Sequence, residues 1–446
     1  MPAGNAPPSP LQAPAAAPPI AAGAGGSDAS LDAEAAQFEA DLLSQTGGGA
    51  GENMKAFSPS LRFYGFADFT IQKWIALSTF GKGYINDHLS FGVSHINLYA
   101  EGDIAPNWKS MAEVRFLFQP SGAAGNPTAA QLANPLANSG RTNSATSDFN
   151  DTNRLVNLGG LAIQRAYIEY TASPYLKIRA GRFLTPWGIW NVDHGSPVII
   201  GPNKPYIVGE QFFPEAQTGF EVLGTAPVGD ATIGYHLTLS NGRGPADAYE
   251  DLDGNKAIGG RVFLRGYWLG QADIGVSAYG GTVTDRRQQI GDLKTQSVEY
   301  FNYSHYREVS WAADLRWLWK GLHFQNEAAV HDRAWSDDAR PPVVAMNGQQ
   351  ADVRRFSMYS LLGYRLPWFN IMPYTIISYY DAGERSAFVG ASKLMGYAVG
   401  LNVRVQPSVV LKSEVSMGHF ISPNAGSVAA SDSDIGVWLS QLAWAF

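Results

Sequence analysis

The sequence predicts an all-β fold, a transmembrane antiparallel β-barrel of about sixteen strands that follows an N-terminal arm. Three observations lead to this fold class. Apolar and polar residues alternate with a period of two from Leu61 to the last residue, and the gaps between these runs are alternately short and long. Only 16% of the residues are charged, while 12% are aromatic and 48 are glycine. Such a chain is poor in charge for a water-soluble protein and rich in the residues that barrels use in aromatic girdles and tight turns.

Composition also narrows the classes of function. The net charge of −7 argues against nucleic acid as a partner. The chain has no cysteine, which excludes disulfides and thiolate metal sites. The eight histidines are scattered along the chain, so we expect neither a metal site nor a cofactor. No apolar run approaches the roughly 20 residues of a membrane helix, so a membrane-spanning form of this chain would cross as strands.

The first 53 residues form a separate region. Residues 2–26 are mostly Ala, Pro and Gly, which predicts a disordered, extended tether. Ser30 can cap a helix, and the apolar residues after it fall on one stripe, so we expect a short amphipathic helix over 31–44. That helix either forms transiently in a tail or docks to a partner or into the pore. The barrel is expected over residues 54–446.

From Leu61 onward the chain has a strand period. The first three strands are expected near residues 61–71, 90–102 and 112–118. In the third, Ala112, Val114, Phe116 and Phe118 alternate with Glu113 and Arg115. Charges on one face and apolar residues on the other suit a wet lumen and a lipid wall. The alternation alone would equally suit a soluble sandwich, so the lengths of the connections decide between the two.

The connections alternate in length along the whole chain. Short turns are expected near 103–107, 172–174, 226–230, 269–271, 320–321, 367–370 and 406–408. Long connections are expected over 72–88, 119–158, 184–216, 241–255, 284–307, 333–353, 382–393 and 420–432. This pattern gives sixteen strands in up-and-down order. With an even number, both chain ends lie on the short-turn side.

The last strand places large apolar residues on one face. Counting back by twos from Phe446 gives Trp444, Leu442, Ser440 and Trp438. A closing strand that ends on an aromatic residue resembles the terminal strand of bacterial outer-membrane β-barrels. In those proteins this strand is read by the insertion machinery, so the resemblance implies an insertion signal at Phe446, Trp444 and Leu442. We expect Phe446 to lie beside Leu61.

Aromatic residues recur at the short-turn ends of the expected strands. They are Trp108, Tyr175, Trp268, Trp319, Trp368 and Phe446. Amphipathic rings favour the membrane–water interface, so this set predicts a girdle at one end of the barrel.

The predicted lumen face carries opposite charges on one face of single strands. The pairs are Glu113/Arg115, Arg165/Glu169 (four apart), Asp314/Arg316 and Lys412/Glu414, and Lys177, Arg179 and Arg404 are further basic candidates. Mixed rings of charge would impose a transverse field across a pore while giving weak net selectivity. The alternative is that they are structural ion pairs filling a plugged lumen.

The segment from Lys177 to Asn191, KIRAGRFLTPWGIWN, resembles the G-x-F-x-x-P-F/W-G stretch of the phosphate-selective porin (porin O/P) family. The opening Tyr-Gly-Phe-Ala-Asp, the Asn107-Trp108 turn and the final Phe446 extend the resemblance over most of 61–446. The resemblance implies a trimeric sixteen-stranded channel in a Gram-negative outer membrane, in contact with its lipid and lipopolysaccharide and with both termini periplasmic.

In that family the third long loop folds inward as a constriction. Carried over to this sequence, the loop is residues 187–216, which hold Asp193, His194 and Lys204. Phosphate selectivity in the family depends on a ladder of lysines and arginines. Lys204 is the only Lys or Arg between Arg182 and Arg243, so phosphate specificity is not expected here.

An enzyme is not expected. Asp193, His194 and Ser196 supply the residue types of a catalytic triad, but near-adjacent residues of one loop cannot form a relay. The chain has no G-x-S-x-G elbow. The expected function is passive diffusion of ions or small hydrophilic solutes. The alternative is a plugged scaffold barrel, in which residues 1–52 or the long loops bind a periplasmic or envelope partner such as peptidoglycan.

Overall fold

The fold was analysed in a computed structural model of the whole chain. The structure describes residues 60–77, 88–119, 157–243, 254–292, 297–337, 342–343, 348–349, 352–383, 393–421 and 433–446. The expected arm over 1–53, with its helix at 31–44, lies outside the described residues.

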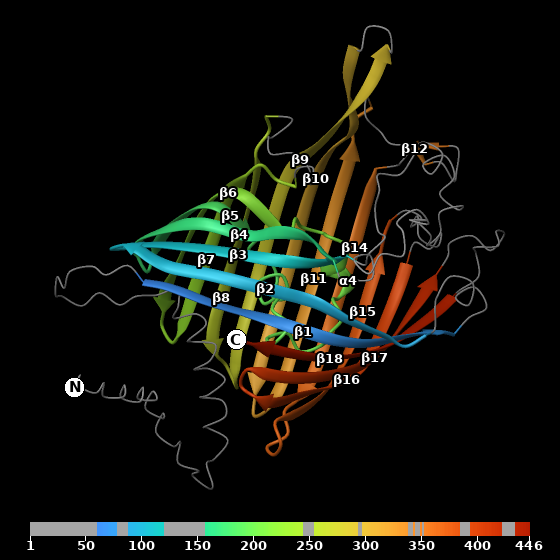
Figure 1. The fold of residues 1–446 in the computed structure, drawn as a ribbon. Helices are drawn as coiled ribbons and strands as arrows, with labels where there is room; N and C mark the ends of the chain where they lie inside the picture. The colour runs from blue at the N-terminus through green and yellow to red at the C-terminus, as the bar shows by residue number, and fades with distance from the viewer. Residues whose placement is uncertain are drawn as a thin grey trace, which may run out of the picture. The chain divides into compact units, whose positions relative to one another are not determined.

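Sixteen strands of the described chain form one closed antiparallel barrel in up-and-down order (Figure 1). The fold class and the strand number are those predicted from the sequence. The strands are β1 (Ser60–Ala76), β2 (Ser90–Ala105), β3 (Trp108–Gln119), β4 (Asn157–Ser173), β5 (Leu176–Leu184), β6 (Ala216–Val228), β7 (Ala231–Ser240), β8 (Ala257–Tyr267), β9 (Gln271–Asp292), β10 (Ser297–Trp319), β11 (Leu322–Trp335), β14 (Val353–Tyr364), β15 (Ile371–Asp381), β16 (Lys393–Gln406), β17 (Val409–Ile421) and β18 (Ser433–Ala445). A separate two-stranded ribbon joins β12 (Pro342–Val343) to β13 (Gly348–Gln349), and one short helix, α4 (Tyr206–Gly209), lies between β5 and β6.

The first and last strands close the barrel. They pair antiparallel from Phe66 opposite Ala445 to Ala76 opposite Ile435. Beyond this ladder, the Gly65 amide donates to the Phe446 carbonyl (2.8 Å) and the Phe446 amide to the Gly65 carbonyl (2.9 Å). Phe446 therefore lies beside Gly65 and not beside Leu61, since β1 begins several residues before its ladder with β18.

All seven expected short turns are present at one end of the barrel. The turn from β10 to β11 passes through Lys320 and Gly321, whose φ angles are 46° and 82°. Two consecutive residues with positive φ make the type I′ turn whose twist matches that of antiparallel strands. At the β2–β3 turn the left-handed residue is Asn107 (φ 66°), a residue type that tolerates this conformation.

One expected long connection is instead mostly strand. Residues 284–307 were predicted to be a loop, but β9 continues to Asp292 and β10 begins at Ser297, so the two form a long hairpin. From Gly281 to Asp292, β9 pairs only with β10, and Figure 1 shows this hairpin extending past the neighbouring strands. Beyond the wall the two strands are held by pairing with each other, so their residues need not show the amphipathic alternation of a wall strand.

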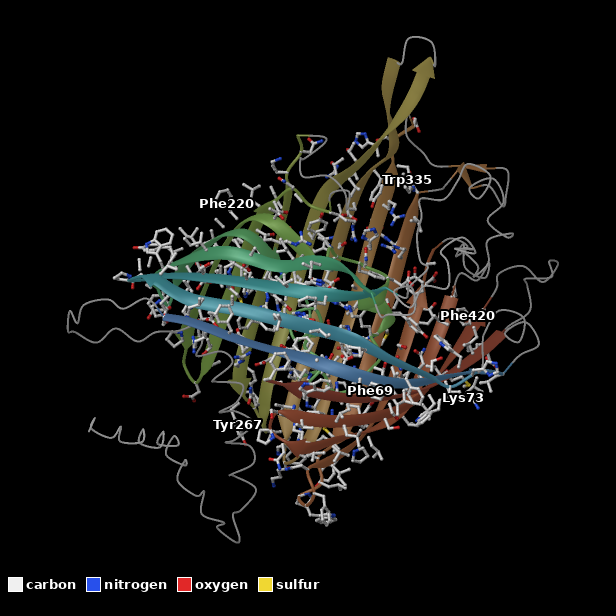
Figure 2. The ribbon with its side chains drawn as sticks, in the orientation of Figure 1. Phe69, Lys73, Phe220, Tyr267, Trp335 and Phe420 are labelled. Carbon is white, nitrogen blue, oxygen red and sulfur yellow. The ribbon has the colours of Figure 1, made fainter. Side chains whose placement is uncertain are left out.

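The polarity of the barrel is the reverse of that of a soluble protein. Charged side chains such as Asp68, Glu113 and Lys412 are fully buried, while large apolar side chains of the same strands are exposed. Exposed examples are Phe220 (58%), Val399 (61%) and Trp311 (58%), and side chains radiate from the outside of the wall in Figure 2, where Phe220 is labelled. Alternate residues therefore face a polar interior and an apolar exterior, as the two-residue period predicted.

The six aromatic residues at the short-turn ends are all exposed. Their exposed fractions run from 38% for Trp108 to 59% for Trp368 and Phe446. Trp319 is stacked on Trp317 (centroids 5.8 Å apart), and Trp108 packs against Tyr170 of β4 (4.9 Å). The predicted girdle is thus present at this end of the wall.

Depth along the outer wall gives a test of this polarity. Val399 lies in the middle of β16, and Val405 lies on the same outer face near the short turn. We expect Val399→Arg to lower the free energy of unfolding from lipid bilayers by about 2–4 kcal/mol and Val405→Arg to cost at most about 1 kcal/mol. The measurement is reversible urea unfolding in vesicles. Equal costs at the two positions would contradict the assigned wall.

Candidate functional site

The connection between β5 and β6, residues 185–215, contacts strands on all sides of the barrel. We call it the inward segment. Its main chain or side chains bond to Asp68 on β1, Glu113 on β3, Glu327 on β11, Asn402 on β16 and Lys412 on β17. Since these strands lie on opposite sides of a closed sheet, the segment crosses the interior.

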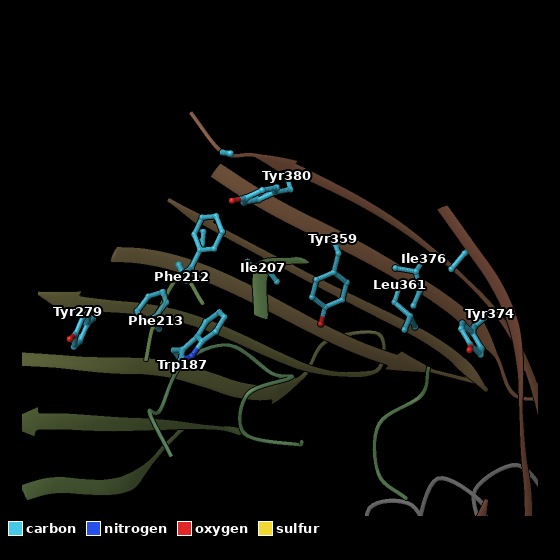
Figure 3. Close-up of a cluster of buried hydrophobic side chains, with 14 of the residues drawn as sticks. Trp187, Ile207, Phe212, Phe213, Tyr279, Tyr359, Leu361, Tyr374, Ile376 and Tyr380 are labelled. Carbon is cyan, nitrogen blue, oxygen red and sulfur yellow. The ribbon is translucent and has the colours of Figure 1, made fainter. Parts of the chain in front are cut away.

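An apolar cluster attaches the two ends of the inward segment to the wall. Trp187 and Phe213 stack with centroids 4.6 Å apart, and Phe213 lies 6.2 Å from the ring of Tyr279 on β9. Phe212 packs edge-on against Tyr380 of β15 (6.1 Å). Figure 3 shows these rings together with Ile207 facing Tyr359 and Leu361 of β14. Burying a large apolar side chain is worth about 1.5–3 kcal/mol, so this cluster holds the ends of the segment firmly.

The helix α4 packs against a part of the wall where two residues are glycine. A Cβ at Gly396 of β16 would lie 2.8 Å from Cε2 of Tyr206, and one at Gly418 of β17 would lie 3.2 Å from its hydroxyl. These two glycines therefore make room for the Tyr206 ring. Burial, assisted by nearby Glu210, raises the pKa of the Tyr206 phenol to about 12, so it remains a neutral donor at physiological pH.

The middle of the inward segment is held by a polar clamp on Asp68. Its carboxylate accepts hydrogen bonds from the Ser196 hydroxyl (2.5 Å), the Gln441 amide of β18 (3.0 Å) and the Ser94 backbone amide (3.1 Å). The imidazole Nδ1 of His95 lies 2.7 Å from the same carboxylate. On the other side of Ser196, the Lys412 ammonium donates to its backbone carbonyl (2.5 Å).

This clamp assembles serine, histidine and aspartate, but not as a nucleophilic relay. The Ser196 hydroxyl donates directly to Asp68 and lies 3.4 Å from Nδ1 of His95, the same ring nitrogen that faces the carboxylate. A relay needs the serine and the carboxylate on different ring nitrogens. The near-adjacent residues Asp193, His194 and Ser196 of the segment have separate partners: Asp193 pairs with Arg316, His194 lies near Glu113, and Ser196 donates to Asp68.

The interior charges pair between strands and not along them. Glu113 is directly opposite Arg165, and the two form an ion pair of 2.6 Å. Arg179 binds Glu169 on one side (2.6 Å) and Glu221 on the other (2.5 Å). These short ion pairs join neighbouring strands, whereas the sequence analysis grouped the charges by strand, as Glu113/Arg115, Arg165/Glu169, Asp314/Arg316 and Lys412/Glu414. Residues two apart on a strand are separated by about 7 Å, whereas direct cross-strand neighbours lie about 5 Å apart.

Several predicted site residues converge on the inward segment. Glu113 lies 3.1 Å from Nε2 of His194, and Glu414 accepts from Asn203 (2.7 Å) and from Tyr374 (2.8 Å). Arg316 forms an ion pair with Asp193 of the segment. The guanidinium of Arg404 points to the Pro197 carbonyl (3.4 Å). Asp314, two residues before Arg316 on β10, forms an ion pair with Arg261 of β8 (2.5 Å).

Other predicted residues lie apart from this network. Lys204 is exposed on the inward segment, while Lys177 is buried in β5 nearer the short-turn end, opposite Leu223. Arg115 lies two residues after Glu113 and is the next residue on the same face of β3. Leu442 and Trp444 face outward on β18, as Phe446 does.

Four residues that complete the network were not identified from the sequence. Glu221 and His236 extend the charged row on β6 and β7, Glu308 lies fully buried on β10, and Tyr359 donates to the Glu327 carboxylate. Glu221 was detectable, because it lies on the polar face of a strand next to Arg179. The approach of Tyr359 to the inward segment was not, since it depends on where the segment crosses the lumen.

No cluster of three or more metal-ligating side chains occurs among the described residues. No helix in the same part of the chain is long and apolar enough to cross a membrane.

Comparison with known proteins adds to the fold. No protein-family model matches the chain, and no curated protein matches it. Similar solved structures include an anion-selective porin from Comamonas acidovorans, at 12% identity and TM-score 0.51, covering 87% of this chain and 100% of that one. Another is the outer membrane channel DcaP of Acinetobacter baumannii, at 12% identity and TM-score 0.50, covering 89% and 100%. At this identity the likeness establishes a porin-like barrel fold.

The clamp can be tested by removing its carboxylate. We expect Asp68→Ala to lower the free energy of unfolding by about 3–5 kcal/mol, because several buried donors, including Ser196 and Gln441, lose their shared acceptor. Asp381→Ala, which breaks a partly exposed pair with Lys393, should cost at most about 1 kcal/mol. Denaturant unfolding of both variants measures the difference. A clamp that contributes nothing would leave the two variants alike.

Proposed function

We propose that the protein is an outer-membrane channel of a Gram-negative bacterium through which ions or small hydrophilic solutes diffuse passively. The observation that carries this proposal is the reversed polarity of the wall. Fully buried charges such as Glu113 line the inside, while side chains such as Phe220 and Val399 are exposed around the outside. In water a continuous apolar wall of this kind would drive aggregation, whereas in a bilayer it meets lipid.

The proposed channel function also implies an orientation of the barrel in the membrane and a set of partners. The start of β1 and the end of β18 meet at the short-turn end, and short turns are periplasmic in the outer-membrane barrels that this chain resembles. Both termini are therefore assigned to the periplasm, and the outer wall to membrane lipid and lipopolysaccharide. The motif over residues 177–191 supports kinship with the phosphate-selective porins and, with it, a homotrimer. Residues 1–52 are then available to a periplasmic partner.

The inward segment is proposed as the constriction. Its exposed side chains include Val192 (47% exposed) and Lys204. Arginines and carboxylates face it from different strands, as with Arg316 on β10 and Glu113 on β3. Such an arrangement sets a transverse field where the lumen is narrowest.

The second candidate is a plugged barrel that serves as a scaffold. One observation favours it: the inward segment is packed against the wall by an apolar cluster in which Trp187, Ile207 and Phe212 are at most 1% exposed. A lumen filled with such a core would conduct little. Its long loops or residues 1–52 would then bind an envelope partner.

Conductance separates the two candidates. Single-channel recordings in planar bilayers should show discrete openings for the full chain and for a chain lacking residues 1–52. Openings only after truncation would mean that the arm blocks the lumen. Silence from both forms, with folding confirmed, would refute the channel and support the scaffold.

Thiol labelling tests the constriction directly, since the native chain has no cysteine. A small cationic methanethiosulfonate reagent should reduce the current of a Val192→Cys channel, because this side chain is exposed inside the lumen. Val399→Cys is the matched control: it is exposed to a similar degree (61%) but on the lipid-facing wall. Unchanged current in Val192→Cys, with the modification verified by mass, would remove the inward segment from the path.

A further inference from the structure

Three arginines face the interior near the long-loop end of β10, β11 and β14. They are Arg243, which follows β7, Arg333 on β11 and Arg355 on β14. In the β11–β14 ladder, Arg333 is opposite Val353 and Arg355 is opposite His331, so the two arginines are diagonal neighbours on one face. All three act electrostatically on the same buried side chains, Tyr306 and His331.

A single buried carboxylate serves this cluster. Glu308 is directly opposite Arg333 in the β10–β11 ladder, yet its ion pair is with Arg243, whose Nε lies 3.1 and 3.2 Å from the two carboxylate oxygens. Nε2 of His331 lies 3.7 Å away on the same carboxylate. Asp352, which lines a pocket together with Arg333, accepts a hydrogen bond from the Trp335 backbone amide (2.8 Å). Another carboxylate in the neighbourhood, Glu210 of the inward segment, is exposed. It receives a bond from Arg355 only at its backbone carbonyl (3.1 Å).

Arg333 and Arg355 are held by aromatic rings and have no carboxylate partner among the described residues. Arg333 lies over the rings of Tyr306 (4.8 Å) and Trp335 (5.4 Å), and Trp335 is labelled in Figure 2. Arg355 lies over Phe212 of the inward segment (5.1 Å) and is only 7% exposed. The Nε atoms of both are buried without a hydrogen-bond partner within this part of the chain.

Buried positive charge of this kind is costly unless a negative group compensates it. An ionised group removed from water needs a counter-charge or hydrogen bonds to its charged form. Aromatic faces offset only part of this cost. They also fix the guanidinium planes, and within the described chain the Nε–H of each arginine has no hydrogen-bond partner. A fixed edge of this type is suited to the two oxygens of a carboxylate or phosphate.

We propose that Arg333 and Arg355, supported by Arg243, form a binding site for one oxyanionic group, a carboxylate or phosphate carried by a solute. The site is built partly from the wall and partly from Phe212 and Glu210 of the inward segment. An occupant would therefore tie the end of the segment to β11 and β14. The proposal rests on the channel function for the source of its occupant, a solute that enters from the long-loop side.

Arg354 provides a matched control on the same strand. It neighbours Arg355 but faces outward, where it forms a two-bonded ion pair with Asp332 (2.6 and 3.0 Å). Arg354→Gln and Arg355→Gln therefore remove the same charge from opposite faces of β14. Arg355→Lys keeps the charge but loses the planar, two-donor edge.

The test is calorimetric titration of the full chain in detergent with inorganic phosphate and with succinate, against chloride at equal ionic strength. We expect saturable binding of at least one oxyanion, weakened tenfold or more in Arg333→Gln and Arg355→Gln, less in Arg355→Lys, and unchanged in Arg354→Gln. Preference for phosphate would define a tetrahedral oxyanion, and preference for succinate a carboxylate. Heat-modifiable mobility in electrophoresis confirms that each variant is folded.

Two results would overturn the site: no saturable binding by the native chain, or equal weakening by Arg354→Gln and Arg355→Gln. Bilayer recordings on the same preparations keep the two proposals apart. Conductance without oxyanion binding refutes only this site. Oxyanion binding without conductance refutes only the channel.

Discussion

The barrel depends on the closure of its backbone hydrogen-bond ladder between β1 and β18. An open sheet leaves one row of amide and carbonyl groups unpaired on each edge, and in a hydrocarbon environment each such group costs several kcal/mol. Closure removes both edges, down to the reciprocal bonds between Gly65 and Phe446. Only then can the outside of the wall face hydrocarbon. The reversed polarity, the buried charges and the enclosed segment all presuppose that the sheet is closed.

Once the sheet is closed, the charged side chains of the interior need partners, because bulk water does not surround every group. The strand register supplies partners by placing opposite charges on neighbouring strands: Glu113 is opposite Arg165, Glu169 is opposite Arg179, and Arg265 is opposite Asp273. These pairs cost little chain entropy, because the strands already hold the partners about 5 Å apart. The inward segment supplies further partners, as Asp193 does for Arg316 and Asn203 for Glu414. Arg333 and Arg355 have no carboxylate partner from either source among the described residues.

The sequence was a good guide to whatever a single strand determines. A period of two assigned Glu113 to the inside and Leu442 to the outside, and turn residues such as Asn107 and Gly321 marked the short connections. It was a poor guide to relations between strands. Opposite charges could be grouped only along single strands, because the stagger of one strand against the next is not written in either strand alone. The β9–β10 hairpin was mistaken for a loop because, past the wall, its strands need no apolar face.

The inward segment marks the limit of sequence reasoning in the site. The motif around Trp187 placed it correctly between β5 and β6, but its contacts join residues from most of the barrel's strands. Asp68 and Ser196 are 128 positions apart, and Asn402 and Ile200 are 202 apart. Gly396 and Gly418 matter only because Tyr206 arrives above them. No local pattern encodes such meetings, which arise from the closed topology.

The bond between Gln441 and Asp68 joins residues 373 positions apart, and this has a consequence for the order of assembly. Loop-closure entropy must be met before so distant a contact stabilises anything, which places this fold among slowly maturing topologies. A nascent chain that lacks its last dozen residues has no seam to form and keeps two adhesive edges. Synthesis of the chain must therefore finish before the barrel can close, and until then the chain needs a chaperone that covers the two unpaired strand edges.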